Sequence, residues 1–340
     1  MIRLLSPFPI ALLGVAVFHV LALPLPWLLG PIMACLTAAL AGVPMKGVTV
    51  LNNLMRTILG VAVGATITPA VLASMTGMWP TLLLIPVMTA CIGLIGVPYF
   101  QRVWSYDFPT AYYSAMPGGL QDMLVFGEEA GGNPRTLSLI HATRILVIVV
   151  VLPFLLHLLW DADLTRPPGA PAASIGPVQL LIMVACAIGG WRIAKAVGMF
   201  GASILGPLIV AALAALTGVL QHRPPAEAIW LAQFFIGMTV GVKYSGITFA
   251  EVRRDVVAGF GFCGILFVLT FAFVELVYGL GLAPGMEALL AFAPGGQAEM
   301  AVLALIVGAD VAFVVAHHVL RILLVILGAP LFARIFPGRS

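Results

Sequence analysis

A seven-residue motif that occurs twice in a mostly apolar chain places the strongest constraint on the fold. It reads Pro-Gly-Gly-Leu-Gln-Asp-Met at residues 117–123 and Pro-Gly-Gly-Gln-Ala-Glu-Met at residues 294–300, which is 177 positions later. Proline lacks a backbone N–H and glycine is entropically costly in a helix, so each motif predicts a helix break with unpaired backbone groups. In lipid, such groups are tolerated only where they line protein or a water-filled cavity.

The composition is that of a polytopic membrane protein. Hydrophobic residues make up 62% and charged residues 9% of the 340 residues, against roughly 45–50% and about 25% in globular domains. Ten apolar runs approach the roughly 20 residues that span a bilayer. They cover residues 5–23, 26–42, 51–71, 81–99, 136–158, 176–196, 202–220, 228–247, 257–280 and 311–333. The sequence therefore predicts an all-α protein with about ten transmembrane helices.

The second half of the chain repeats the first at a nearly constant offset. The matched features include a Leu-Gly-Pro segment, a glycine pair, the two motifs, a histidine and an arginine. In order, residues 29–31 match 205–207, residues 60 and 64 match 237 and 241, His141 matches His318, and Arg144 matches Arg321. We therefore predict two transmembrane repeats, residues 1–159 and 175–340, joined by an extracytoplasmic linker at residues 160–174.

Basic residues predict that the two repeats are inverted, because Lys and Arg remain on the cytoplasmic side. In the first half they flank the N-terminus and the loops after the second and fourth spans, whereas in the second half they follow the first and third spans. These residues are Arg3, Lys46, Arg56 and Arg102, and then Arg192, Lys195, Lys243, Arg253 and Arg254. Inversion requires an odd number of crossings per repeat, and five spans with a motif segment that enters and returns satisfy this condition. A segment that crosses fully makes six crossings and a parallel repeat.

With inverted repeats, both termini are predicted to be cytoplasmic, in agreement with Arg334 and Arg339 near the C-terminus. The predicted location is the cell inner membrane.

Two carboxylates occupy the same motif position, Asp122 and Glu299. A charge at this depth is costly and usually faces a cavity, a partner or an ion. The helix N-terminus after each break would offer amides to an anion, and the carboxylate would offer oxygen to Na⁺ or a proton site. The alternative is a carboxylate that caps the helix dipole. The backbone part of this candidate binding site is Pro117, Gly118, Gly119, Pro294, Gly295 and Gly296.

Each repeat also places a histidine three residues before an arginine, so that the pair shares one helix face. His141 with Arg144, and His318 with Arg321, are candidate binding residues for an anionic substrate. The arginines could instead form a salt bridge to Asp122 or Glu299, or extend to the membrane interface.

Two further glycine patterns recur in both halves. The Gly-Pro pairs at residues 30–31 and 206–207 indicate either a proline near a helix start or a second unwound helix. The glycine pairs 60/64 and 237/241 predict close helix packing.

These motifs resemble those of the AbrB-type integral membrane family, which is defined by an internal AbrB duplication. The segments that carry the resemblance are residues 27–31, 116–119 with 122–123, and 293–296 with 299–300, and the resemblance spans nearly the whole chain. Ser203 departs from the pattern, because Trp27 stands at the matching position of the first copy. The arrangement is also similar to secondary transporters built from inverted repeats with re-entrant glycine-rich hairpins.

Members of this family carry labels such as ammonia monooxygenase or transcriptional regulator, which the residues do not favour. A metal oxygenase needs clustered ligands, and the six histidines are scattered except for the adjacent pair 317–318. A DNA-binding regulator needs a basic polar module, and no loop is long enough to hold one. No nucleophile with an adjacent base is visible either, so we predict neither an enzyme nor a nucleic-acid partner.

The leading hypothesis is an ion-coupled secondary transporter of a small organic anion, with a central site at the two breaks. Na⁺ or H⁺ would be the coupling ion, and no other cofactor is predicted. The partners would be a small-molecule substrate and membrane lipid, and glycine-rich faces also permit a homodimer. The alternative is a membrane sensor that binds a small ligand and affects gene expression indirectly.

Overall fold

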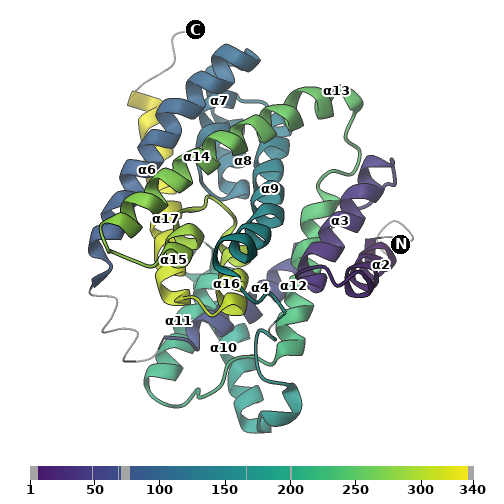
Figure 1. Cartoon of the computed structure of the whole chain (residues 1–340), viewed down its shortest axis with the longest axis vertical. Helices are drawn as coiled ribbons and strands as arrows, with labels where there is room; N and C mark the ends of the chain where they lie inside the picture. The colour runs from purple at the N-terminus through teal and green to yellow at the C-terminus, as the bar shows by residue number, and fades with distance from the viewer. Residues whose placement is uncertain are drawn as a thin grey trace. The chain divides into compact units, whose positions relative to one another are not determined.

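The computed structural model describes residues 7–47, 49–67, 69, 77–165, 167–199 and 201–335. Arg3 and Arg339, which contributed to the prediction of cytoplasmic termini, lie outside these residues, as does the end of the predicted span 51–71. The regular structure of the described residues is helical throughout (Figure 1). The all-α prediction is therefore confirmed.

The apolar segments form helices of two length classes. In the described part of the chain, five helices are long and apolar enough to cross a membrane: Trp79–Val103, Pro134–Trp160, Pro177–Ala196, Phe249–Gly279 and Val311–Gly328. Shorter apolar helices of 10–17 residues cover Pro7–Val20, Pro26–Leu40, Val50–Gly64, Ala202–Leu216, Ala226–Val242 and Gln297–Val307. The protein is thus an integral membrane protein with several apolar helices.

The chain divides into two compact units, and each unit takes segments from both predicted repeats. Unit 1 comprises residues 1–77, 153–246 and 298–312. Its helices are α2 (Pro7–Val20), α3 (Pro26–Leu40), α4 (Thr49–Gly64), α10 (Pro177–Ala196), α11 (Ala202–Leu216), α12 (Ala226–Val242) and all but the first residue of α16 (Gln297–Val307), with the short turn η3 (Ala172–Ser174). The predicted boundaries of the repeats therefore differ from those of the compact units.

Unit 2 comprises residues 78–152, 247–297 and 313–340. Its helical elements are α6 (Trp79–Pro98), η2 (Tyr99–Val103), α7 (Phe108–Ala115), α8 (Leu120–Glu129), most of α9 (Pro134–Trp160), α13 (Phe249–Glu251), η4 (Val252–Val256), α14 (Val257–Gly279), α15 (Gly285–Phe292) and most of α17 (Val311–Ile335). This unit holds α7, the first break, α8 and α15.

Within unit 1, the third helix of each repeat packs against the second helix of the other repeat. Helix α4 packs on α11, and α12 packs on α3. A Cβ atom at Gly60 would overlap the carbonyl oxygen of Ile204, and one at Gly237 would overlap that of Leu28. Glycine is needed because only hydrogen allows the backbones to approach this closely. The predicted packing role of these glycines is confirmed, and the two contacts are themselves a repeated pair.

The Gly-Pro pairs of the second spans have a packing role as well. Gly30 lies against the backbone of Gly14, and Gly206 lies against that of Gly190. The prolines that follow them lie inside the continuous helices α3 and α11. Of the two interpretations of these pairs, the second unwound helix was therefore wrong, because each proline lies inside a continuous helix.

Candidate functional site

The duplicated motifs break the helices at the predicted positions. In the first copy, α7 ends at Ala115 and α8 begins at Leu120, so that Pro117, Gly118 and Gly119 form the connection. Met116 and Gly119 flank it in extended conformations, with ψ of 127° and 140°. The N-cap residue of α8 is Gly119, which offers no side chain to the first N–H groups of the helix.

The second copy is built in the same way. Helix α15 ends at Phe292, and α16 begins at Gln297. Between them lie Pro294, Gly295 and Gly296, and Ala293 precedes them with ψ of 126°. Both broken segments are thus confirmed as structural features.

An arginine from the following long helix holds the carbonyl groups of the first break. Arg144 of α9 donates from Nη1 to the Met116 oxygen at 3.1 Å and from Nη2 to the Gly118 oxygen at 2.9 Å. One turn earlier, His141 Nε2 lies 2.9 Å from the carbonyl oxygen of Tyr113, near the end of α7. One planar guanidinium therefore satisfies two carbonyl groups that the break removes from the helix.

The second copy reproduces these contacts with the same offset. Arg321 of α17 donates from Nη1 to the Ala293 oxygen and from Nη2 to the Gly295 oxygen, both at 3.0 Å. His318 Nε2 donates to the Leu290 oxygen at 2.9 Å, and its Nδ1 accepts from Arg321 Nη2 at 2.9 Å. Because a carbonyl oxygen can only accept, this geometry requires the proton on Nε2. We call each arginine with its two carbonyl groups an arginine clamp.

Both clamps are deeply buried cations. The exposed fractions of Arg144 and Arg321 are 2% and 3%, and the charge of Arg144 acts on Arg321. Neither arginine forms an ion pair with a carboxylate in the described ranges. They therefore do not extend to the interface, and the salt bridge considered from the sequence is not formed there. Carbonyl dipoles are the groups that stabilise each charge, an arrangement that neither sequence interpretation named.

The first broken segment turns back on itself. The N–H of Asn133, just after α8, donates to Thr110 Oγ1 in the first turn of α7 at 2.8 Å. Near the end of α8, a Cβ atom at Gly127 would lie 3.3 Å from the Cβ of Tyr113 in α7. The end of α8 therefore lies beside α7, and the two short helices form a hairpin whose tip is the Pro-Gly-Gly connection.

The two motif carboxylates lie in the first turns of the second half-helices. Asp122 in α8 is half-buried, whereas Glu299 in α16 is 4% exposed and its Oε2 makes no hydrogen bond. The charge of Lys243, which follows α12, interacts with Glu299 and with Arg56 of α4. Sequence reasoning used Lys243 and Arg56 only to orient loops. Their position within or at the end of apolar runs was the signal that could have identified them.

A polar cluster supports the first hairpin. The buried carboxylate of Asp255 in η4 accepts from the Tyr106 hydroxyl at 2.7 Å and from Thr136 Oγ1 at 3.1 Å. Arg254 lies over the Tyr106 ring, 5.0 Å from its centroid. Thr136 lies in the first turn of α9, the helix that carries the first clamp. The cluster therefore joins the start of that helix to the segment that precedes α14.

The described residues contain no group of three or more His, Cys, Asp or Glu side chains that could hold a metal ion.

Comparisons with known proteins agree with the duplicated architecture. The family model described as "Transition state regulatory protein AbrB" matches residues 27–337. A Bacillus subtilis (strain 168) protein named "Uncharacterized protein YhjN" is 30% identical over 82% of this chain and 76% of its own length. An Escherichia coli (strain K12) protein named "Putative regulator AbrB" is 23% identical over 93% of this chain and 91% of its own length. This chain therefore belongs to the AbrB family of integral membrane proteins.

Proposed function

We propose that the protein is a secondary transporter of the cell inner membrane and that its solute site is formed at the two broken segments. The observation that carries this proposal is the repeated arginine clamp. In both copies a buried arginine occupies the carbonyl groups of the break, so the amide end of the following half-helix is the backbone group left to bind a solute. Paired half-helices of this kind form the substrate sites of inverted-repeat transporters.

The hairpin of the first copy supports the inverted topology. A segment that enters and returns contributes no net crossing, so the first repeat makes five crossings. With the same return in the second copy, the second repeat is inverted relative to the first. This topology places both termini in the cytoplasm, in agreement with the basic residues of the loops. Because each compact unit takes helices from both repeats, movement of one unit against the other is the proposed route of alternating access.

The charges of the site favour a small organic anion as the solute. Arg144, Arg321 and Lys243 are cations within or at the ends of apolar helices, and neither arginine is neutralised by a carboxylate in the described ranges. Glu299 is the buried carboxylate with an oxygen available to Na⁺ or H⁺, and we assign it the coupling role. Buried ionisable residues in membrane proteins commonly serve such functions.

The experiment measures current from purified protein in proteoliposomes on a solid-supported membrane. Small organic acids, amino acids and ammonium are applied with a Na⁺ gradient or a pH step. We expect a current specific to one organic acid that is lost in Glu299→Gln and retained in Glu275→Gln, which removes an exposed carboxylate of α14. Unchanged uptake and ion dependence in Glu299→Gln would show that the coupling assignment is wrong.

The names of the family and of its Escherichia coli member favour a second function, that of a membrane sensor. A sensor binds a small ligand at the same breaks without net flux. In the same preparation, a ligand that raises the thermal stability but produces neither current nor counterflow identifies a sensor.

A further inference from the structure

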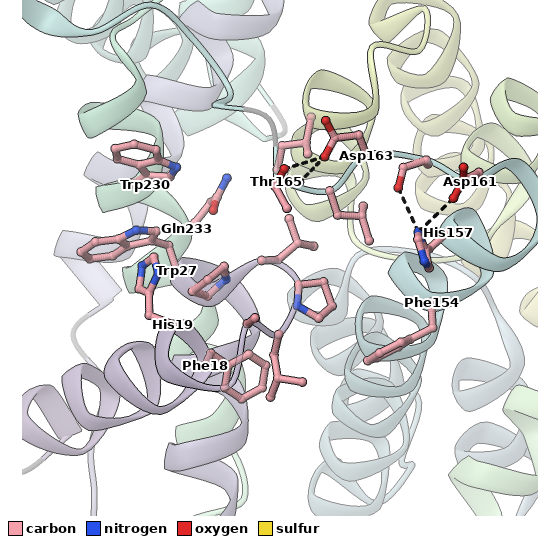
Figure 2. Close-up of a pocket in the computed structure, with 18 residues that line it drawn as sticks. Phe18, His19, Trp27, Phe154, His157, Asp161, Asp163, Thr165, Trp230 and Gln233 are labelled. Carbon is pink, nitrogen blue, oxygen red and sulfur yellow. Dashed lines mark hydrogen bonds and ion pairs between the residues drawn. The ribbon is translucent and has the colours of Figure 1, made fainter.

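Unit 1 contains a cavity of about 890 Å³. Its walls come from the end of α2, the connection to α3 and the first turn of α3, helix α12, the end of α9 and the chain that follows it, and Ile306 of α16 (Figure 2). The volume lies within the usual range for a small-molecule site, about 300–1,000 Å³. The cavity is therefore large enough for an organic ligand and contains none of the Pro-Gly-Gly residues.

One wall of the cavity is aromatic. The rings of Trp27 and Trp230 are stacked, with centroids 6.3 Å apart and an interplanar angle of 16°. His19 meets the Trp27 ring edge-on at 6.1 Å, and Phe18 and Phe154 line the same space (Figure 2). The negative face of an indole attracts a cation more strongly than the other aromatic rings do. This wall therefore favours a ligand that is both apolar and positively charged.

The charged residues of the cavity favour the same ligand. Asp161 and Asp163 line it from the segment after α9, and none of the described lining residues is Lys or Arg. Asp161 is paired with His157 at 3.8 Å, and Asp163 accepts bonds from the Thr165 N–H at 2.9 Å and its hydroxyl at 2.6 Å. The two contacts from Thr165 hold the Asp163 carboxylate in place, whereas the Asp161 side chain is almost fully exposed. Two carboxylates thus line the cavity on the side opposite the tryptophan rings (Figure 2).

A buried polar side chain also faces the cavity. Gln233 of α12 is 2% exposed, yet its amide nitrogen makes no hydrogen bond. Figure 2 shows its amide turned from the tryptophan side of the cavity toward the acidic segment. A buried amide without a partner is unfavourable, and a polar group of a bound ligand would satisfy it. This unpartnered amide is independent of the aromatic and acidic residues.

Backbone strain is concentrated around the same space. Ala22, Leu25 and Asp161 line the cavity and have φ of 49°, 51° and 50°. Together they are three of the four non-glycine residues with positive φ in the described ranges. Such conformations are costly and cluster at ligand sites.

We propose that this cavity binds an organic ammonium ion. The ammonium group lies against the indole rings of Trp27 and Trp230, Asp161 and Asp163 supply the opposite charge, and Gln233 binds a polar group of the ligand. The ammonium group belongs either to a free organic cation or to a lipid headgroup. Because the site uses none of the broken-segment residues, this proposal does not depend on the proposed transport function.

The test uses the full-length protein in nanodiscs of phosphatidylglycerol, a lipid without an ammonium group. Isothermal titration calorimetry compares choline with 3,3-dimethylbutan-1-ol, which has the same shape but no charge. We expect choline to bind at least tenfold more tightly than the neutral alcohol. Equal binding of the two compounds, or no binding of choline, overturns the proposal.

Variants locate the site. Trp230→Leu is expected to lower the affinity for choline at least tenfold, and Trp230→Phe, which retains a ring, only a few-fold. Asp161→Asn combined with Asp163→Asn should weaken binding several-fold. Trp79→Leu replaces an exposed tryptophan of α6 outside the cavity and serves as the matched control. An equal loss in Trp79→Leu, or full affinity in Trp230→Leu, contradicts the assignment, and Trp230→Phe guards against a folding defect.

Nanodiscs of phosphatidylcholine distinguish the two sources of the ammonium group. If a headgroup occupies the cavity, choline binding falls at least tenfold in these discs, and native mass spectrometry finds phosphatidylcholine retained by the wild type but not by Trp230→Leu. If the ligand is a free cation, choline binds equally in both lipids. Either result supports the ammonium site, and loss of choline binding with no Trp230-dependent lipid overturns it.

Discussion

The two broken segments share one backbone mechanism but differ in the surroundings of their carboxylates. In each, an arginine of the next long helix donates to two carbonyl groups of the break, at matching positions and nearly equal distances. Asp122 is half-buried in a half-helix that ends in exposed acids, whereas Glu299 lies in a half-helix that is buried from residue 298 to residue 306. The duplication has therefore kept the groups that hold the break and allowed the acidic position to diverge.

Removal of a clamp should cause the largest loss of stability, and it tests whether the two copies are equivalent. Arg144→Met and Arg321→Met each leave two buried carbonyl groups unpaired. At about 1.5–3 kcal/mol for each bond to a charged group, the expected loss of stability is roughly 3–6 kcal/mol. Arg321→Met should be the more severe, because Arg321 also donates to His318. Thermal unfolding of the purified variants in detergent measures both losses.

The control for the clamps is Arg192→Met, which replaces an exposed arginine of α10. Its stability should match that of the wild type. Arg321→Lys distinguishes charge from geometry, because an ammonium group does not offer the planar fork that reaches two carbonyl groups. Full stability of Arg321→Lys would show that the charge alone is sufficient and that the two-bond clamp is not needed.

Disruption of the polar cluster of the first copy should cause an intermediate loss of stability. The second copy lacks this cluster and therefore serves as the comparison. Ala283 and Phe313 stand where the offset of 177 would repeat Tyr106 and Thr136. Burial, and then the hydrogen bond to Asp255, raise the pKa of Tyr106 above its ordinary value, so the phenol remains a donor at neutral pH. Tyr106→Phe should therefore cost about 1.5–3 kcal/mol of stability.

The matched control is Tyr278→Phe, at an exposed position of α14. Hydrogen exchange of the segments around α8 and α16 tests where the loss occurs. Faster exchange confined to the first copy is expected, and equal exchange in both would show that the cluster supports the fold as a whole.

The glycine contacts of unit 1 test the equivalence of the repeats directly. Gly60→Ala and Gly237→Ala each force a methyl group against a carbonyl oxygen of the other repeat. Overpacking of this kind costs typically about 1–3 kcal/mol, and we expect the two losses to be similar. Gly264→Ala is the control, because a Cβ atom there meets nothing within 4 Å. Markedly unequal losses in thermal unfolding would show that the two crossings support the fold to different extents.

Sequence reasoning succeeded where the signal lies in side-chain identity and failed where it lies in the backbone. The breaks and the glycine crossings follow from residues whose conformational limits are known in advance. The clamp was missed because the partners of Arg144 and Arg321 are carbonyl groups 26 and 28 residues earlier in the chain, and every residue type carries a carbonyl. The Gly-Pro pairs were partly misread because the backbone neighbour of Gly30 is set by tertiary packing.

The Trp27 and Trp230 pair shows the same limit. Trp27 was noted only as part of a repeated motif, and Trp230 stands in an apolar run 203 residues later. Only the packing of α12 against α3 brings their rings together. A contact between side chains so far apart in the sequence can be recognised only once the fold is known.

The motif carboxylates should have the smallest effect on stability, and this prediction separates function from structure. Glu299→Gln retains the shape of the side chain and removes a buried charge whose Oε2 makes no hydrogen bond. It also removes the attraction to Lys243, but the two groups form no ion pair in the described ranges. No buried pair is broken, and relief of the buried charge of Glu299 offsets the lost attraction, so we expect a change within about 1 kcal/mol. Asp122→Asn should also change little, because that site is half-buried. Thermal unfolding and transport current are measured on the same preparations. A loss of current at unchanged stability marks Glu299 as a residue retained for function, whereas a destabilisation as large as that of Arg321→Met would make it part of the support of the break.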